Sequence, residues 1–227
     1  MRSWGVDGYK RRWISVWLND DLSAAGWELI NNTDQLMALD ASMLMIDIPI
    51  GLPDTGYRGC DLAARRLLGA AAPRVFLGLR RPLLQYLNDY AAANAWAKSD
   101  GKGLAKQSFS ILPKIASIDS VMTPERQSQF RESHPELVFQ RLNNGAVLPT
   151  KHSAEGLRLR QELLTRLGFV ALVSWLEQLR GTGAKPDDLF DACALALAAH
   201  DAVQGRVMRA NNETNRDSRG LCMEIWY

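Results

Sequence analysis

The feature that most constrains the fold is an apolar run that ends on an acid. Residues 43–48 read MLMIDI, and Pro49 and Gly51 follow directly. A short apolar run bounded by proline and glycine predicts a buried strand. Its terminal carboxylate, Asp47, is costly to remove from water unless a counter-charge or an opening to solvent compensates it. The run therefore predicts a strand that delivers Asp47 to a place where it has a partner.

The elements around this strand predict a mixed sheet. Residues 3–8 and 13–18 read as two strands joined by a basic turn, and residues 27–30 as a third. Helix-start residues precede a short helix expected at about 34–41, and the apolar strand at 42–48 follows. The order β-β-β-α-β is typical of an α/β fold in which helices flank a sheet with both parallel and antiparallel strands.

Length and composition favour one domain over residues 1–227, because 227 residues with 47% hydrophobic content can bury a substantial core. Within it we expect a helical, basic insertion at about 55–115. Further helices are expected at 156–167, 169–179 and 186–203. The three cysteines are far apart and form no CxxC pair, which argues against a disulfide framework or a zinc site. With no leader-like or membrane-length apolar stretch, we expect a cytoplasmic protein without a membrane partner.

Charge is distributed unevenly along the chain. Residues 58–114 carry 10 lysines and arginines against 3 acids, whereas residues 1–57 carry 4 against 8. An acidic region beside a basic one is what a carboxylate site with a polyanion-contacting surface would show. A solvated basic helical face explains the same numbers equally well.

Four carboxylates lie where such a fold could bring them together. Asp7 is on the first strand, Asp47 ends the apolar strand, and Asp188 and Asp191 are three residues apart at the start of the last helix. Converging carboxylates require cations, and hard ions such as Mg²⁺ or Mn²⁺ prefer oxygen ligands. The structural alternatives are a turn role for Asp7, a helix cap at Asp187 or Asp188, and an exposed position for Asp191.

Motifs along the whole chain resemble a known family. They are GVDGYKRRW, IDIPIGLP, RGCDLAARRLLG, VFLGLRRPLL, GKGLAKQSFSILPKIASID, SHPELVFQRLN, DDLFDACALALAAHDA and GLCMEIWY. Together they are similar to the predicted RNase H-like nucleases classed as domain of unknown function 429. The resemblance implies an RNase H-like fold and a carboxylate set like that of the Holliday-junction resolvases, carried here by Asp7, Asp47, Asp188 and Asp191 as catalytic and metal-binding residues.

The mechanism that this resemblance implies uses two metal ions about 4 Å apart to clamp the scissile phosphate. Asp7 would bridge the metals, Asp47 would hold one, and Asp188 and Asp191 the other. One departure is that the acid on the fourth strand is typically a glutamate, so the shorter Asp47 puts the metal spacing in question.

Further candidate residues come from three of these motifs. His134 and Glu136 are expected to act in proton transfer or phosphate orientation, with a capping histidine as the alternative. Phosphate and sugar contacts are expected from basic and polar side chains of the insertion, although a Gly-Lys-Gly stretch is more often a mobile loop. These substrate-binding candidates are Arg80, Arg81, Lys102, Lys106, Gln107 and Lys114.

The leading hypothesis is a metal-dependent RNase H-like nuclease that hydrolyses phosphodiester bonds of DNA or RNA by a two-metal mechanism. An actin-like ATP-dependent phosphotransferase ranks second, because IDIPIGLP lacks the second glycine-rich phosphate loop of that class. A non-catalytic binding module with the same fold is the third hypothesis. The substrate, and the choice between a monomer and a dimer, stay open.

Overall fold

The computed structural model describes residues 2–227, which form two compact units. The first unit comprises residues 2–47, 129–208 and 226–227, and the second comprises residues 48–128 and 209–225. The insertion expected at about 55–115 lies within the second unit. We describe each unit by itself.

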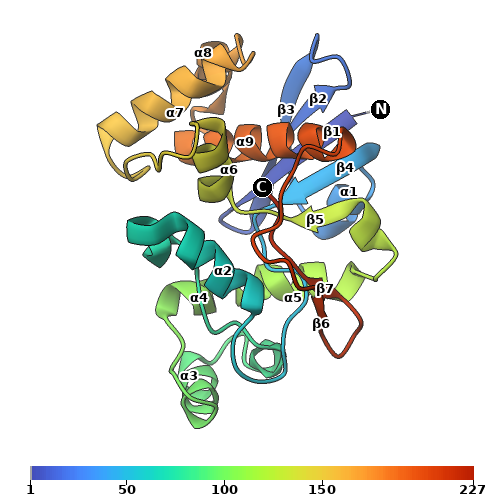
Figure 1. Ribbon diagram of the computed structural model, residues 1–227, viewed down its shortest axis with the longest axis vertical. Coiled ribbons are helices and arrows are strands. Elements are labelled where there is room, and N and C mark those ends of the chain that lie inside the picture. Colours follow the sequence, from blue (N-terminus) through green and yellow to red (C-terminus); the bar gives the residue numbers. More distant parts are fainter. Residues whose placement is uncertain (1) are drawn as a thin grey trace. The chain divides into compact units, whose positions relative to one another are not determined.

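The first unit is built on a five-stranded sheet with the order β3-β2-β1-β4-β5 (Figure 1). Strands β1 (Arg2–Tyr9), β2 (Arg12–Asn19) and β3 (Ala25–Ile30) form an antiparallel meander. The chain then passes through α1 (Thr33–Met37) to β4 (Ala41–Ile46), which runs parallel to β1, and β5 (Phe130–Glu132) runs parallel to β4. The predicted α/β fold with a mixed sheet is confirmed.

Helix α9 (Pro186–Val203) lies across one face of this sheet and contacts β1, β2 and β4 (Figure 1). The approach is close because the strand has no side chain at Gly5, where an added Cβ would lie 2.1 Å from both Ala192 O and Ala196 N. Helices α6 (Pro135–Leu142) and α7 (Ala154–Arg166) pack on α9, and buried residues of α8 (Leu172–Leu179) join the same core. The core of this unit therefore lies between the sheet and its helices.

The second unit is mainly helical, as expected. Its helices are α2 (Gly59–Leu68), α3 (Tyr90–Ser99), α4 (Lys106–Ser110) and α5 (Leu112–Val121), with 3₁₀ turns at Gly69–Arg74, Arg81–Gln85 and Arg126–Ser128. The short strands β6 (Asn215–Arg216) and β7 (Cys222–Met223) form a hairpin. The end of the chain is thus less regular than its apolar sequence suggests.

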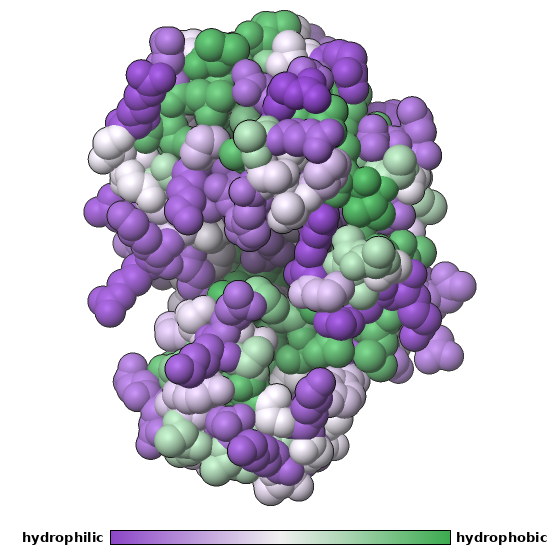
Figure 2. Space-filling model, turned by 90° about the vertical axis from the view of Figure 1, so that its left-hand side faces the viewer, coloured by the Kyte–Doolittle hydropathy of each residue, from purple (hydrophilic) through white to green (hydrophobic). Residues whose placement is uncertain are grey.

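Within residues 2–227, no helix is long and apolar enough to cross a membrane. The face of the first unit seen in Figure 2 mixes hydrophilic and hydrophobic side chains. Val170 and Val173 are among the exposed apolar residues of this unit. Single exposed valines of this kind are normal for a folded domain and define no site.

Candidate functional site

Two carboxylates lie side by side at the carboxyl ends of the central parallel strands. Val6 pairs with Ile46 in the sheet, and the backbone N–H of Asp47 donates to Val6 O at 3.0 Å. Because side chains alternate along a strand, Asp7 shares the face of Gly5, which α9 covers. Asp47 likewise shares the face of Met45, which packs in the core with α9. Strand register thus directs both carboxylates toward α9.

Helix α9 contributes a third carboxylate to the same place. Asp191, in its second turn, is 1% exposed, and its charge raises the pKa of Asp7. Asp188, one turn earlier, accepts a hydrogen bond from the backbone N–H of Lys185 at 2.7 Å. The helix cap predicted at Asp187 or Asp188 is therefore Asp188. Its side chain, inside the first turn, accepts from the backbone N–H of the residue that precedes the helix. The structure brings Asp7, Asp47 and Asp191 together, with Asp188 at the margin.

The cation that accompanies these acids is Lys151, which precedes α7. Its Nζ donates to Asp191 Oδ2 and lies 3.8 Å from Asp187 Oδ2. Although burial disfavours the ammonium, the negative charges of Asp191, Asp7 and Asp47 raise the pKa of Lys151 above its ordinary value. Asp47 therefore lies close enough to a positive charge to interact with it electrostatically.

One ammonium does not neutralise the whole cluster. Burial raises the pKa of Asp191 to about 7, and the charge of Asp47 adds to this effect against the opposing charge of Lys151. Burial, followed by the charges of Asp191 and Asp47, raises the pKa of Asp7 well above its ordinary value. Asp191 Oδ1 is buried and has no hydrogen-bond partner within residues 2–227. When its carboxylates are ionised, the cluster holds excess negative charge, and it offers an oxygen to a further donor or cation.

This donor set was tested as a place for the metal ions that the sequence predicts. Carboxylate oxygens are the ligands that Mg²⁺ and Mn²⁺ prefer, and the excess charge favours a divalent cation. However, in the part of the chain described, no three histidine, cysteine or acidic side chains are arranged to hold a metal as they stand. The Lys151 ammonium lies against Asp191 in this arrangement. The donor types suit a divalent ion, and binding one requires the carboxylates to rearrange around it.

Comparison with known proteins supports the resemblance at the level of the family. The family model described as "Protein of unknown function (DUF429)" matches residues 5–216. The chain belongs to this family. No curated protein and no solved structure matches the chain. The match to DUF429 includes every acid of the cluster and Lys151.

The two residues expected to transfer protons have structural partners in this DUF429 chain. His134 precedes α6 as its N-cap, and its Nδ1 accepts from the backbone N–H of Glu136 at 3.3 Å. The Glu136 carboxylate accepts two bonds from Arg160 Nη2, at 2.8 and 2.9 Å, and both side chains are buried. The geometry favours the capping role for His134 and an ion-pair role for Glu136, although the charge of Glu136 also raises the pKa of Asp191.

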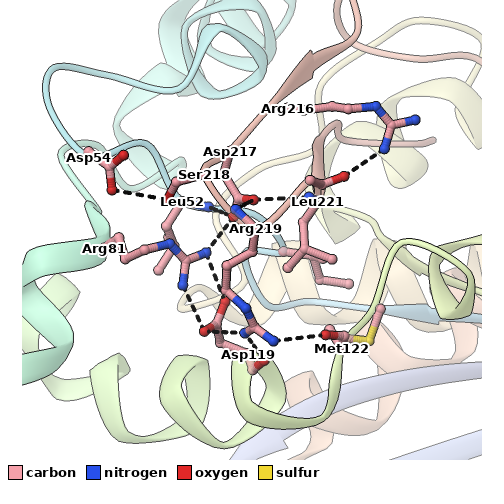
Figure 3. Close-up of polar contacts among 12 residues, drawn as sticks. Leu52, Asp54, Arg81, Asp119, Met122, Arg216, Asp217, Ser218, Arg219 and Leu221 are labelled. Atoms are coloured by element: carbon pink, nitrogen blue, oxygen red, sulfur yellow. Dashed lines mark hydrogen bonds and ion pairs between the residues drawn. The ribbon is translucent and has the colours of Figure 1, made fainter.

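The predicted substrate residues Arg80 and Arg81 are held within the second unit. Arg80 is 1% exposed, and its guanidinium pairs with Asp100 at 2.8 Å and donates to several backbone carbonyls. Arg81 pairs with Asp119 at 2.9 Å and also with Asp217, as Figure 3 shows. Both guanidinium groups pair with acids of this unit, and we assign them structural roles.

The other substrate candidates are more accessible. Lys102, Lys106 and Gln107 are exposed, and Lys114 is half-buried in α5. The Lys106 ammonium lies 5.9 Å from the centre of the Tyr90 ring, a weak cation–π contact. The exposed cations of the GKGLAK stretch are therefore available to an anionic ligand.

Sequence reasoning missed Lys151, Arg160 and Asp217. Arg160 had a detectable signal, because it shares one helix face with Gly156, Leu163 and Leu164, all of them buried. Lys151 lies in a loop without periodicity, so only the excess of predicted acids pointed to an unidentified cation. No pattern around Asp217 distinguishes it from the other polar residues of its loop.

Proposed function

We propose that this protein is a metal-dependent phosphodiester hydrolase with an RNase H-like fold that acts on nucleic acid. One observation carries the proposal: Asp7, Asp47 and Asp191 converge from two parallel strands and a helix, so that three carboxylates lie near the single ammonium of Lys151. The β-β-β-α-β order of the sheet is the core that the family resemblance implies, and it supports the fold assignment.

The chemistry follows from where the chain places its oxygens. A Mg²⁺ or Mn²⁺ ion held by Asp7, Asp47 and Asp191, with Asp188 nearby, would supply a Lewis acid for phosphodiester hydrolysis. The chain's own contribution is positioning: the β1–β4 pairing sets the separation of Asp7 and Asp47, and Gly5 lets α9 bring Asp191 close. A rigid sheet and a buried helix hold such groups more accurately than loops do.

Nucleic acid is the proposed substrate class because the second unit offers exposed cations. Lys102 and Lys106 lie in the stretch expected to contact phosphates, and Gln107 is exposed beside them. Lysines of this kind contribute sequence-independent phosphate contacts. Arg80 and Arg81 are not included in the proposed contact surface, because acids of their own unit hold them.

One observation favours a second candidate, the non-catalytic binding module. The ion pair between Lys151 and Asp191 compensates part of the cluster's charge without any metal. A module stabilised in this way would have no affinity for divalent cations. The two candidates therefore differ in a quantity that calorimetry measures.

The first test is a calorimetric titration of Mn²⁺ and Mg²⁺ into the wild type and into Asp7→Asn. We expect millimolar or tighter binding in the wild type and its loss in Asp7→Asn, because that change removes the carboxylate at the centre of the donor set. Asp34→Asn is a matched control, since Asp34 is an exposed acid of α1 in the same unit. Absence of binding in the wild type would contradict the proposal, whereas binding justifies cleavage assays on single- and double-stranded DNA and RNA.

A further inference from the structure

The loop that carries Lys151 is held in place by hydrogen bonds and close packing. Ser153 caps α7, and both its backbone N–H and its Oγ donate to Thr150 O, at 3.1 and 2.8 Å. The loop also packs directly on the first turn of α7, because a Cβ on Gly156 would lie 2.0 Å from Thr150 O. The backbone on either side of Lys151 is therefore held in one conformation.

A buried arginine ties this loop to its surroundings. Arg160, which is 0% exposed, donates to Pro149 O at 2.7 Å and to Gly156 O at 3.1 Å. Its other terminal nitrogen makes the two bonds to Glu136 of α6 described above. Burying such a pair is costly unless its hydrogen bonds are well formed, so it provides a specific anchor. The anchor directs Lys151 toward Asp191.

The ammonium itself, in contrast to its backbone, can leave the cluster. Lys151 keeps 28% of its side-chain surface exposed, whereas the Asp191 side chain keeps 2%. A lysine has a flexible four-carbon stem, so the ammonium can move to water while the loop stays in place. The acids cannot move in the same way because strands and a buried helix hold them.

From this geometry we propose that Lys151 is an internal competitor of the divalent cation. Its ammonium holds Asp191 Oδ2 inside the carboxylate cluster, so a divalent ion attracted to the unpaired Oδ1 would meet that positive charge at close range, and the two cations repel each other there. Lys151 is thus a positioning residue. Without metal, its positive charge holds the acids together, and it also lowers the affinity of the cluster for a divalent ion. The inference rests on the proposed function, because it assumes that the cluster binds a divalent ion.

The test is a calorimetric titration of Mn²⁺ into the wild type, Lys151→Met and Lys151→Arg. Methionine keeps the length of the stem without the charge, so we expect Mn²⁺ to bind at least about tenfold more tightly, as removal of one close positive charge predicts. Arginine keeps the charge, so its affinity should equal the wild-type value or fall below it. Lys185→Met is the matched control, because Lys185 is an exposed lysine beside the same helix and is hydrogen-bonded to Asp188 only through its backbone.

The outcomes separate the two proposals. Mn²⁺ binding of equal strength in the wild type and Lys151→Met would overturn the competitor role and leave the metal site standing. Absence of binding in every variant would overturn the metal-dependent function, and the competitor role with it. If Lys151→Met does not fold without metal, Lys151→Arg decides: tighter binding than in the wild type overturns the inference. A merely structural lysine would lower stability on removal without raising metal affinity.

Discussion

Two buried aspartates, Asp191 in the first unit and Asp217 in the second, differ sharply in how their charge is satisfied. Asp217 accepts from the backbone N–H groups of Leu52, Leu221 and Arg219 at 2.9–3.0 Å and from the guanidinium of Arg81 (Figure 3). Asp191 accepts one bond, from Lys151, and its other oxygen has no partner among the described residues.

The pKa values follow this difference in hydrogen bonding. Burial alone would raise the pKa of Asp217, but the backbone and guanidinium donors lower it below its ordinary value. For Asp191, burial dominates and raises the pKa to about 7. A buried carboxylate with a structural role usually accepts hydrogen bonds at both oxygens. A buried carboxylate with few donors and a raised pKa is typical of a binding or catalytic site. The comparison thus separates a structural aspartate from the one that we propose to be functional.

The largest effect on stability is expected from Asp217, whose two carboxylate oxygens both accept hydrogen bonds. Asp217→Ala should lower the free energy of unfolding by about 3–5 kcal/mol, because it leaves three backbone donors without their acceptor and removes one of the two acids that pair with Arg81. Urea unfolding measures this change. Asp54→Ala is a matched control in the same unit, since Asp54 is exposed and accepts only from Ser218 Oγ at 3.2 Å. Equal losses in the two variants would refute the structural role of Asp217.

A smaller effect is expected from Gly5, whose missing side chain brings Asp191 close to β1. Gly5→Ala should cost about 2–3 kcal/mol, because its Cβ would lie 2.1 Å from the backbone of α9 and force the helix outward. The same variant should weaken any Mn²⁺ binding by separating the acids. Gly59→Ala is the control, since the nearest atom to its Cβ would lie 3.7 Å away. Wild-type stability in Gly5→Ala would refute the close approach.

The last expected effect concerns pH. The raised pKa of Asp191, about 7, means that between about pH 4 and pH 7 the folded protein holds a proton that the unfolded chain has released. Stability without metal should therefore fall as pH rises through this window. Melting temperatures from pH 5 to pH 8 in the presence of a chelator measure the slope.

Asp7→Asn should flatten this slope and raise the melting temperature near pH 8, because it removes one of the repelling charges. The lowered pKa of Asp217 has the opposite sign, and its contribution is lost only in more acidic solution. A strongly destabilised Asp7→Asn would instead identify Asp7 as a structural residue of the hairpin, which was its alternative role.

Much of the first unit was predictable because its signals are local. Alternation and apolar runs predicted strands at 3–8, 13–18, 27–30 and 42–48, and the structure has them within a few residues. The helix expected at 186–203 is present at those bounds. The alanine-rich stretch 83–97 also predicts a helix, but helix α3 begins only at Tyr90, since residues before it form a 3₁₀ turn and a loop. Periodicity located the regular elements and lost accuracy where loops interrupt them.

The sequence by itself determined the order of the elements β-β-β-α-β and the need of Asp47 for compensation, because strand periodicity and the cost of burying charge are local properties. Only the tertiary structure decided the order of the strands within the sheet, the place of Lys151 among the acids, and the pairing of Arg80 and Arg81 within their own unit. Arg81 reaches Asp217 across 136 positions of the chain, and Lys151 reaches Asp191 across 40. Such pairs depend on how loops pack, and a loop has no repeating pattern from which its contacts can be read.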